Sequence, residues 1–79
     1  MQKTTPQKID LSAMAASWPS PLIARKEISR FTGGLLSEKY LANLDCAGKG
    51  PAGRVKIGRK VCYRVDALIS WLEGRAENL

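Results

Sequence analysis

The sequence predicts a small α+β domain, in which two short helices joined by a turn precede a two-stranded β-hairpin and a last helix. Three observations carry this prediction. Apolar residues recur at helical spacing before residue 48 and after residue 65. Between them, in GRVKIGRKVCYRVD, apolar and charged residues alternate with the period of two that strands require. Glycines and prolines separate these segments, and 79 residues are enough for one domain.

Residues 1–17, MQKTTPQKIDLSAMAAS, are polar at first and then rich in alanine, without a clear period. We expect a flexible N-terminal arm, in which Asp10 could cap a loose turn of helix. Trp18 is the first residue large enough to anchor this arm to a core. Pro19 and Pro21 then favour an extended chain, because a residue that precedes proline avoids the helical region.

The first predicted helix covers residues 25–32. Ile28 and Phe31 lie three positions apart and therefore on one helical face. The pair Gly33-Gly34 follows, which is typical of a helix C-terminus.

The second predicted helix begins after Ser37, a favourable N-cap residue. Glu38 suits the positive end of the helix dipole, and Leu41 and Leu44 mark the buried side. Gly48 helps to end the helix. Two short helices joined by a few residues that contain glycine have the outline of a helix-turn-helix.

Residues 53–66 predict the hairpin, with Gly58-Arg59-Lys60 at its tip, where glycine supplies the backbone freedom of a tight connection. One face is expected to be cationic and solvated, and the other apolar and packed inward. The residues expected to pack inward are Val55, Ile57 and Val65.

Asp66 is expected to cap the last helix, DALISWLEGR, which Gly74 closes. Its apolar residues follow the spacing i, i+3, i+4, i+7. The predicted folded domain therefore covers residues 18–74, and residues 75–79 form a frayed tail. The expected buried residues of this helix are Val65, Leu68, Ile69 and Leu72.

The charge balance favours an acidic partner. Lys and Arg number 13 against 7 Asp and Glu, which gives a net charge of +6 and a pI near 9.8. Nucleic acid is the first candidate and a membrane surface the second; a merely basic, soluble surface is the alternative.

Composition argues against catalysis. The chain has no histidine, the commonest general base and metal ligand. No nucleophile beside a base, no Walker phosphate loop and no metal-ligand spacing is recognisable. We therefore expect a protein that is not an enzyme and uses no cofactor, metal or small-molecule substrate.

Cys46 and Cys62 are too few for a disulfide framework. Each lies among apolar residues, so both are expected to be buried, reduced thiols, which suggests the cytosol. No signal peptide and no membrane-spanning segment is recognisable. We expect a cytoplasmic protein, associated with the nucleoid and not with a membrane.

The basic hairpin and the second helix are the candidate DNA-binding elements. A cationic finger gains affinity by releasing counterions from DNA, although a charged edge can also serve only to prevent strand pairing. In the helix, Asn43 suits adenine, Lys39 could contact guanine or a phosphate, and the Tyr40 hydroxyl could reach a phosphate. Ordinary exposed or partly buried side chains are the alternative for these three. The candidate residues are Ser37, Lys39, Tyr40 and Asn43 in the second helix, Arg54, Lys56, Arg59, Lys60 and Arg64 in the hairpin, and Arg25 and Lys26 in the first helix.

The run SEKYLANLDCAGKGPAGRVKIGRKVCYRVDALISWLEG resembles the small MerR-like, excisionase and AlpA-type DNA-binding proteins of bacteria and their phages. The likeness extends over residues 21–73. Its matching positions are Ser37, Leu41, Leu44, Gly48, Pro51, Lys56-Ile57-Gly58-Arg59, Tyr63-Arg64, Asp66, Leu68, Trp71 and Leu72.

This resemblance implies a winged helix-turn-helix, with the second helix in the major groove and the hairpin as a wing on the backbone or minor groove. It implies an excisionase, that is, a directionality factor for site-specific recombination, or a small transcriptional regulator of a phage or mobile element. The implied partners are double-stranded DNA and an integrase, or further copies of the protein bound cooperatively. Two departures from the family are Ala24, where Ser or Thr often caps the first helix, and Glu38-Lys39, where an arginine pair is common.

Two other functions are compatible with the sequence. A basic adaptor in a phage or recombinase complex would use Trp18 and the alanine-rich arm to bind a protein partner, without reading DNA sequence. Binding of structured RNA is the third hypothesis, but Tyr40 and Tyr63 are too few for a base-stacking platform.

Overall fold

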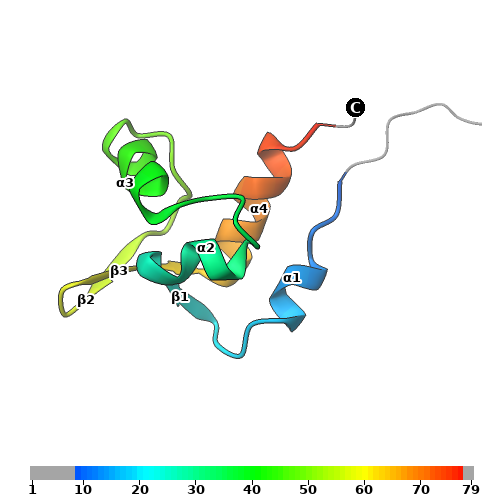
Figure 1. Cartoon of the computed structure of the whole chain (residues 1–79), viewed down its shortest axis with the longest axis horizontal. Helices are drawn as coiled ribbons and strands as arrows, with labels where there is room; N and C mark the ends of the chain where they lie inside the picture. The colour runs from blue at the N-terminus through cyan, green and yellow to red at the C-terminus, as the bar shows by residue number, and fades with distance from the viewer. Residues whose placement is uncertain (1–8, 78–79) are drawn as a thin grey trace, which may run out of the picture.

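The computed structural model describes residues 9–77, in which helices pack against a three-stranded antiparallel sheet of order β1–β3–β2 (Figure 1). This is an α+β fold, as the sequence predicts. The elements are α1 (Ala13–Ala16), β1 (Leu22–Ala24), the 3₁₀ turn η1 (Arg25–Glu27), α2 (Ile28–Phe31), α3 (Glu38–Cys46), β2 (Val55–Ile57), β3 (Lys60–Arg64) and α4 (Val65–Arg75).

Strand β1 is an element that the sequence analysis missed. The chain bends at residues 19–21, so the expectation that the whole segment after Trp18 is extended is wrong there. From Leu22 onward it is extended and pairs with β3, with Ile23 opposite Tyr63. Pro19 and Pro21 precede the strand, so they do not interrupt its hydrogen bonds. The hairpin is therefore joined to a third strand, and β3 is the centre of the sheet.

The predicted hairpin forms, but the expectation that Val55 and Ile57 pack inward is wrong. They are 41% and 55% exposed. A two-residue turn, Gly58-Arg59, places Ile57 opposite Lys60 and Val55 opposite Cys62. Directly opposed residues project from the same face, and Cys62 faces away from the core because its neighbour Tyr63 faces into it.

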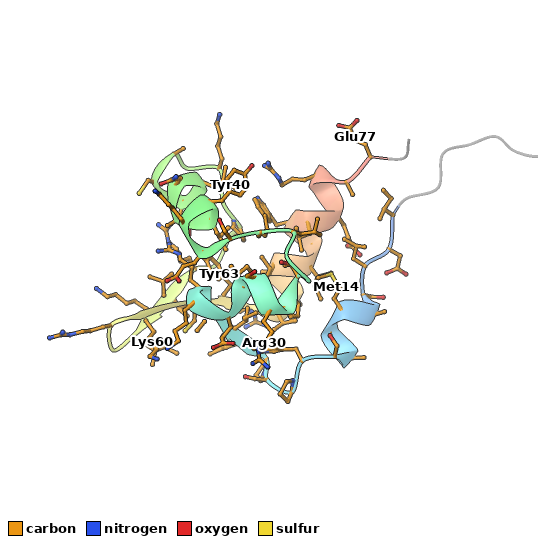
Figure 2. All side chains as sticks on the ribbon, in the orientation of Figure 1. Met14, Arg30, Tyr40, Lys60, Tyr63 and Glu77 are labelled. Atoms are coloured by element: carbon orange, nitrogen blue, oxygen red, sulfur yellow. The ribbon has the colours of Figure 1, made fainter. Side chains whose placement is uncertain are left out.

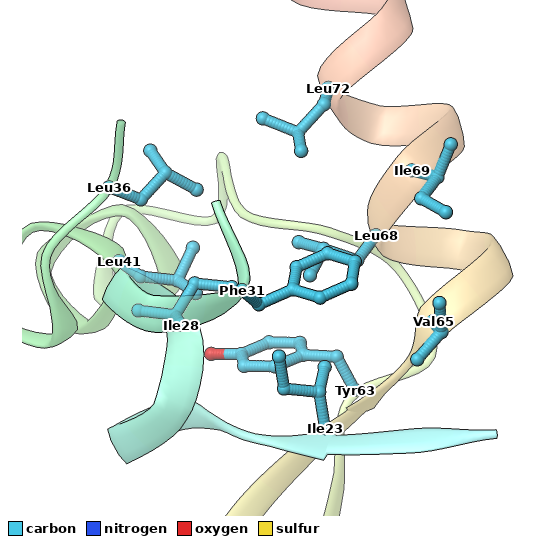
Figure 3. Close-up of a cluster of buried hydrophobic side chains, with 10 residues drawn as sticks. All are labelled: Ile23, Ile28, Phe31, Leu36, Leu41, Tyr63, Val65, Leu68, Ile69 and Leu72. Carbon is cyan, nitrogen blue, oxygen red and sulfur yellow. The ribbon is translucent and has the colours of Figure 1, made fainter. Parts of the chain in front are cut away.

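The hydrophobic core lies between the helices and the inner face of the sheet (Figure 3). Its centre is the completely buried ring of Tyr63, which also carries the hydroxyl group used in the site below. The helical spacing predicted the core positions of α2 and α4 correctly, and Leu41 in α3, whereas Leu44 is only partly buried. The core residues are Ile23, Ile28, Phe31, Leu36, Leu41, Tyr63, Val65, Leu68, Ile69 and Leu72.

The predicted helix ends are partly confirmed. Ser37 is the N-cap of α3, where its Oγ accepts a hydrogen bond of 3.0 Å from the Tyr40 N–H. The prediction that Asp66 caps α4 is wrong. The helix begins at Val65, and Asp66 lies in its first turn, where the carboxylate accepts from the Ala67 N–H. Gly74 does not close α4, which continues through Arg75.

The first predicted helix, residues 25–32, begins as the 3₁₀ turn η1 and continues as α2. Ala24 precedes it without a side-chain cap. Gly33 and Gly34 follow with φ of 64° and 92°, a left-handed conformation that glycine adopts readily.

The described part of the predicted N-terminal arm, from Ile9 onward, packs on the domain. Leu11 and Met14 contact the core, and the Leu11 N–H donates a 2.7 Å hydrogen bond to Glu73 in α4. Ser12, and not Asp10, is the N-cap position of α1, and Asp10 accepts from the Ser12 N–H. Residues 1–8 of the arm and 78–79 of the predicted tail lie outside the described residues.

Across residues 9–77, every helix is too short or too polar to cross a membrane.

Candidate nucleic-acid interface

A buried carboxylate on the inner side of α3 connects this helix to the sheet and to the hairpin. Asp45, whose side chain is 3% exposed, accepts hydrogen bonds from the Tyr63 hydroxyl in β3 and from Arg25 Nη2 in η1, the latter at 2.6 Å. Arg54, just before β2, places Nη1 3.3 Å from the other carboxylate oxygen. Arg25 Nε also donates to the Tyr63 oxygen at 2.9 Å. We call these four residues the Asp45 cluster.

The Asp45 cluster holds its members in defined protonation states. Burial raises the pKa of Asp45, but hydrogen bonds from Tyr63 and Arg25, together with the charges of Arg54 and Arg25, outweigh it and leave the pKa below its ordinary value. Burial and the hydrogen bond to Asp45 raise the pKa of Tyr63 to about 12. At neutral pH the carboxylate is therefore ionised and the phenol protonated.

Three of the predicted DNA-binding arginines are held by carboxylates. Arg25 and Arg54 belong to the Asp45 cluster. Arg64 lies at the end of β3 that is remote from the hairpin tip, with Nε 3.3 Å from Asp66. The structure therefore does not bring Arg64 together with the other hairpin cations.

The solvent-facing side of α3 carries Lys39 and Asn43, which are four positions apart and exposed. Tyr40 lies on the flank of this face, 45% exposed. Ser37 uses its hydroxyl as the N-cap. The expectation that Cys46 is buried is wrong: it is exposed, because its helical position lies opposite Leu41, whereas Cys62 is buried as expected.

The remaining predicted cations of the hairpin, Lys56, Arg59 and Lys60, are exposed. Lys56 is opposite Val61 in the register, and both line a hollow whose other wall is Ala42 and Cys46 of α3. A second hollow brings Lys26 of η1 together with Arg59, Lys60 and Glu38. Figure 2 shows Lys60 on the hairpin and Tyr40 on the side of α3 nearer to α4.

Sequence reasoning assigned no role to Asp45, although the sequence contains a signal for it. Asp45 follows Leu41 by four positions and therefore lies on the apolar side of its helix. A charge at such a position requires partners, because an unpaired buried carboxylate is strongly unfavourable. Its two hydrogen-bond partners, Tyr63 and Arg25, are 18 and 20 positions away in the chain, and no local pattern identifies them.

Comparison of the chain with protein-family models and with curated proteins finds no match.

Gly50 allows the Asp45 cluster to form, and its replacement gives a first prediction. A Cβ at Gly50 would lie 1.9 Å from Asp45 Oδ1 and 3.4 Å from its Cα. Because the carboxylate cannot move without losing its partners, Gly50→Ala should lower the free energy of unfolding by about 1–3 kcal/mol. Urea denaturation measures this change.

Gly74→Ala is the matched control. Gly74 lies in α4, and its added Cβ would have no neighbour within 4 Å. Alanine there should raise the free energy of unfolding by up to about 1 kcal/mol, because it favours the helix. Equal effects of the two changes would contradict the close packing of Gly50 on Asp45.

A second prediction concerns alkaline pH. The unfolded chain releases the Tyr63 proton near pH 10, whereas the folded protein retains it until about pH 12. The contribution of the protonated phenol to the free energy of unfolding is therefore fully present below pH 10 and decreases above it. The wild type should lose about 1.4 kcal/mol of this contribution per pH unit in that window. Tyr63→Phe lacks it, so the difference in unfolding free energy between the two proteins should shrink from pH 10 upward. Urea titrations at pH 8, 10 and 11 measure that difference, and a constant value would contradict the buried phenol.

Proposed function

We propose that the protein is a winged helix-turn-helix protein that binds double-stranded DNA. In this assignment η1–α2 and α3 are the two helices of the motif, α3 enters the major groove, and the β2–β3 hairpin is the wing. One observation carries the proposal: α3 presents an exposed lysine and asparagine beside a hairpin with exposed cations. Within residues 9–77, none of these cations makes an ion pair; they are Lys39, Lys56, Arg59 and Lys60.

The side chains suggest a division of roles. The side-chain amide of Asn43 can donate from Nδ2 to N7 of adenine and accept at Oδ1 from the N6 amino group, and this pair of bonds discriminates between bases. Lys39 suits guanine or a phosphate. Arg59 and Lys60 at the tip suit phosphates, which hold a protein in register but carry no sequence information.

The biological role that we propose comes from the family resemblance. It is sequence-specific DNA binding without catalysis, as an excisionase or as a small transcriptional regulator of a mobile element. A module of this size has a limited interface, so affinity is gained by cooperative binding to repeated sites or by contact with an integrase.

A protein-interaction adaptor is the second candidate, and one observation favours it. Val55 and Ile57 are exposed on the outer face of β2, which is an edge strand of the sheet. Trp18, however, packs within the fold: its ring meets the ring of Phe31 edge-on, with centroids 5.5 Å apart. Retention of a partner after nuclease treatment, with no duplex binding, would favour the adaptor.

The third prediction separates base reading from phosphate contact. Random-site selection followed by affinity measurements should show that Asn43→Ala relaxes sequence preference at one position by about 1–3 kcal/mol, because a base-specific pair is lost. Arg59→Ala should weaken binding to all sequences alike and reduce the salt slope by about 1. For the wild type, a slope of log K against log salt near about −4 to −5 is expected if five phosphates are neutralised.

Two results would be incompatible with the proposal. Duplex binding that does not respond to salt would exclude the phosphate contacts. Equal losses from Asn43→Ala and Arg59→Ala on every sequence would exclude base reading by α3.

A further inference from the structure

The last turn of α4 and the first turn of α3 meet at a corner rich in aromatic and basic groups. The Arg75 guanidinium lies over the Trp71 ring, 4.8 Å from its centroid, and Nη2 donates to the Tyr40 hydroxyl at 3.4 Å. The Trp71 indole N–H donates to the main-chain oxygen of Lys49 at 3.0 Å. Arg75 is thus positioned by Trp71 of its own helix and by Tyr40 of α3, and the hydrogen bond to Lys49 holds the Trp71 ring. The sequence analysis assigned this residue to a frayed tail and gave it no function.

The charge of Arg75 is not neutralised within residues 9–77, since its partners there are a neutral ring and a neutral hydroxyl. Arg30 provides the contrast. It stacks on Trp18 in a similar way, at 5.0 Å, but its Nε is 3.0 Å from the Glu27 carboxylate. Stacking fixes the plane of a guanidinium and leaves its N–H groups directed outward. A fixed, uncompensated guanidinium is suited to a phosphate.

The corner lies on the flank of α3 that is remote from the wing. Ala42 and Cys46 line the hollow toward the hairpin, whereas Tyr40 contacts Arg75. Positions 40 and 42 are about 200° apart around a helix, so they belong to opposite flanks. The exposed side of α3 therefore lies between the flank of Tyr40 and the flank of Ala42. Figure 1 shows α3 with the hairpin on one side and the end of α4 on the other.

We propose that Arg75, supported by Tyr40 and joined by the exposed Lys49, is a second phosphate-binding site that contacts the DNA strand not contacted by the wing. A helix in the major groove has a sugar-phosphate backbone on each side. The wing at one flank and Arg75 at the other would then hold α3 between the two strands. This inference rests on the proposed DNA binding and extends it to a contact that the hairpin cannot make.

The test compares Arg75→Gln with Arg30→Gln, and uses Arg59→Gln as a wing variant. Arg75→Gln and Arg30→Gln each remove one positive charge and one arginine stacked on tryptophan. The probe is duplex DNA of about 30 base pairs, titrated over a range of salt concentrations. Arg75→Gln should weaken binding about 3- to 10-fold and make the salt slope less steep by about 1, because one phosphate contact is lost. Arg30→Gln should change affinity less than about 2-fold, as expected of an arginine already paired with a carboxylate.

Ethylation interference locates the contacts on the wild-type protein itself, independently of the folding of any variant. On a selected site, it should reveal sensitive phosphates on both strands. Arg75→Gln should abolish sensitivity on one strand and Arg59→Gln on the other. Arg75→Lys should retain the salt slope, because the charge remains.

Equal binding by Arg75→Gln and Arg30→Gln, with weaker binding by Arg59→Gln, would overturn the second site and leave the proposed function standing. Ethylation interference confined to a single DNA strand would also overturn the second phosphate-binding site without contradicting the proposed function. Failure of the wild type to bind any duplex would overturn both.

Discussion

The burial of Asp45 is the constraint on which the arrangement of this small fold depends. A carboxylate removed from water is tolerated only with excellent partners, and Asp45 has three: Tyr63, Arg25 and Arg54. These come from the central strand, from η1 and from the residue before the hairpin. The segment between α3 and β2 has no regular secondary structure, so the cluster, more than this connection, sets the position of α3 relative to the hairpin.

Ion pairs divide the predicted DNA-binding cations into two groups. Arg25, Arg54 and Arg64 are paired with carboxylates, and the first two also stabilise the fold. The other predicted cations have no such partner within residues 9–77 and lie on η1, on the exposed side of α3 or on the hairpin; they are Lys26, Lys39, Lys56, Arg59 and Lys60. Net charge alone could not make this distinction, because both groups contribute to it equally. Fewer cations are therefore available to bind DNA than the composition indicates, but those that are available lie close to α3 and the hairpin.

Local patterns in the sequence predicted the helices and the hairpin. The features that they missed depend on contacts between residues far apart in the chain. The spacing of Leu68, Ile69 and Leu72 is sufficient to predict the buried side of α4. The faces of the hairpin depend on its turn: a connection of two residues pairs Val55 with Cys62, and so reverses the expected face of β2. Strand β1 was missed because three residues carry little periodicity. For the site, side-chain type suggested Lys39 and Asn43, but Asp45 and Arg75 acquire their roles from residues 18 to 35 positions away.

Two attachments hold α3 by its opposite ends. Near its C-terminal end, Asp45 connects it to the sheet; in its first turn, Tyr40 meets Arg75 from α4. The hydrogen bond from Trp71 to Lys49 also ties the connection after α3 to α4. Because α3 is held at both ends, its exposed side keeps a fixed orientation relative to the hairpin. That rigidity is what base reading needs, because phosphate contacts set the register in which a side chain such as Asn43 meets a base edge. The core within residues 9–77 has ten residues, and polar bonds add to it in fixing the orientation of α3.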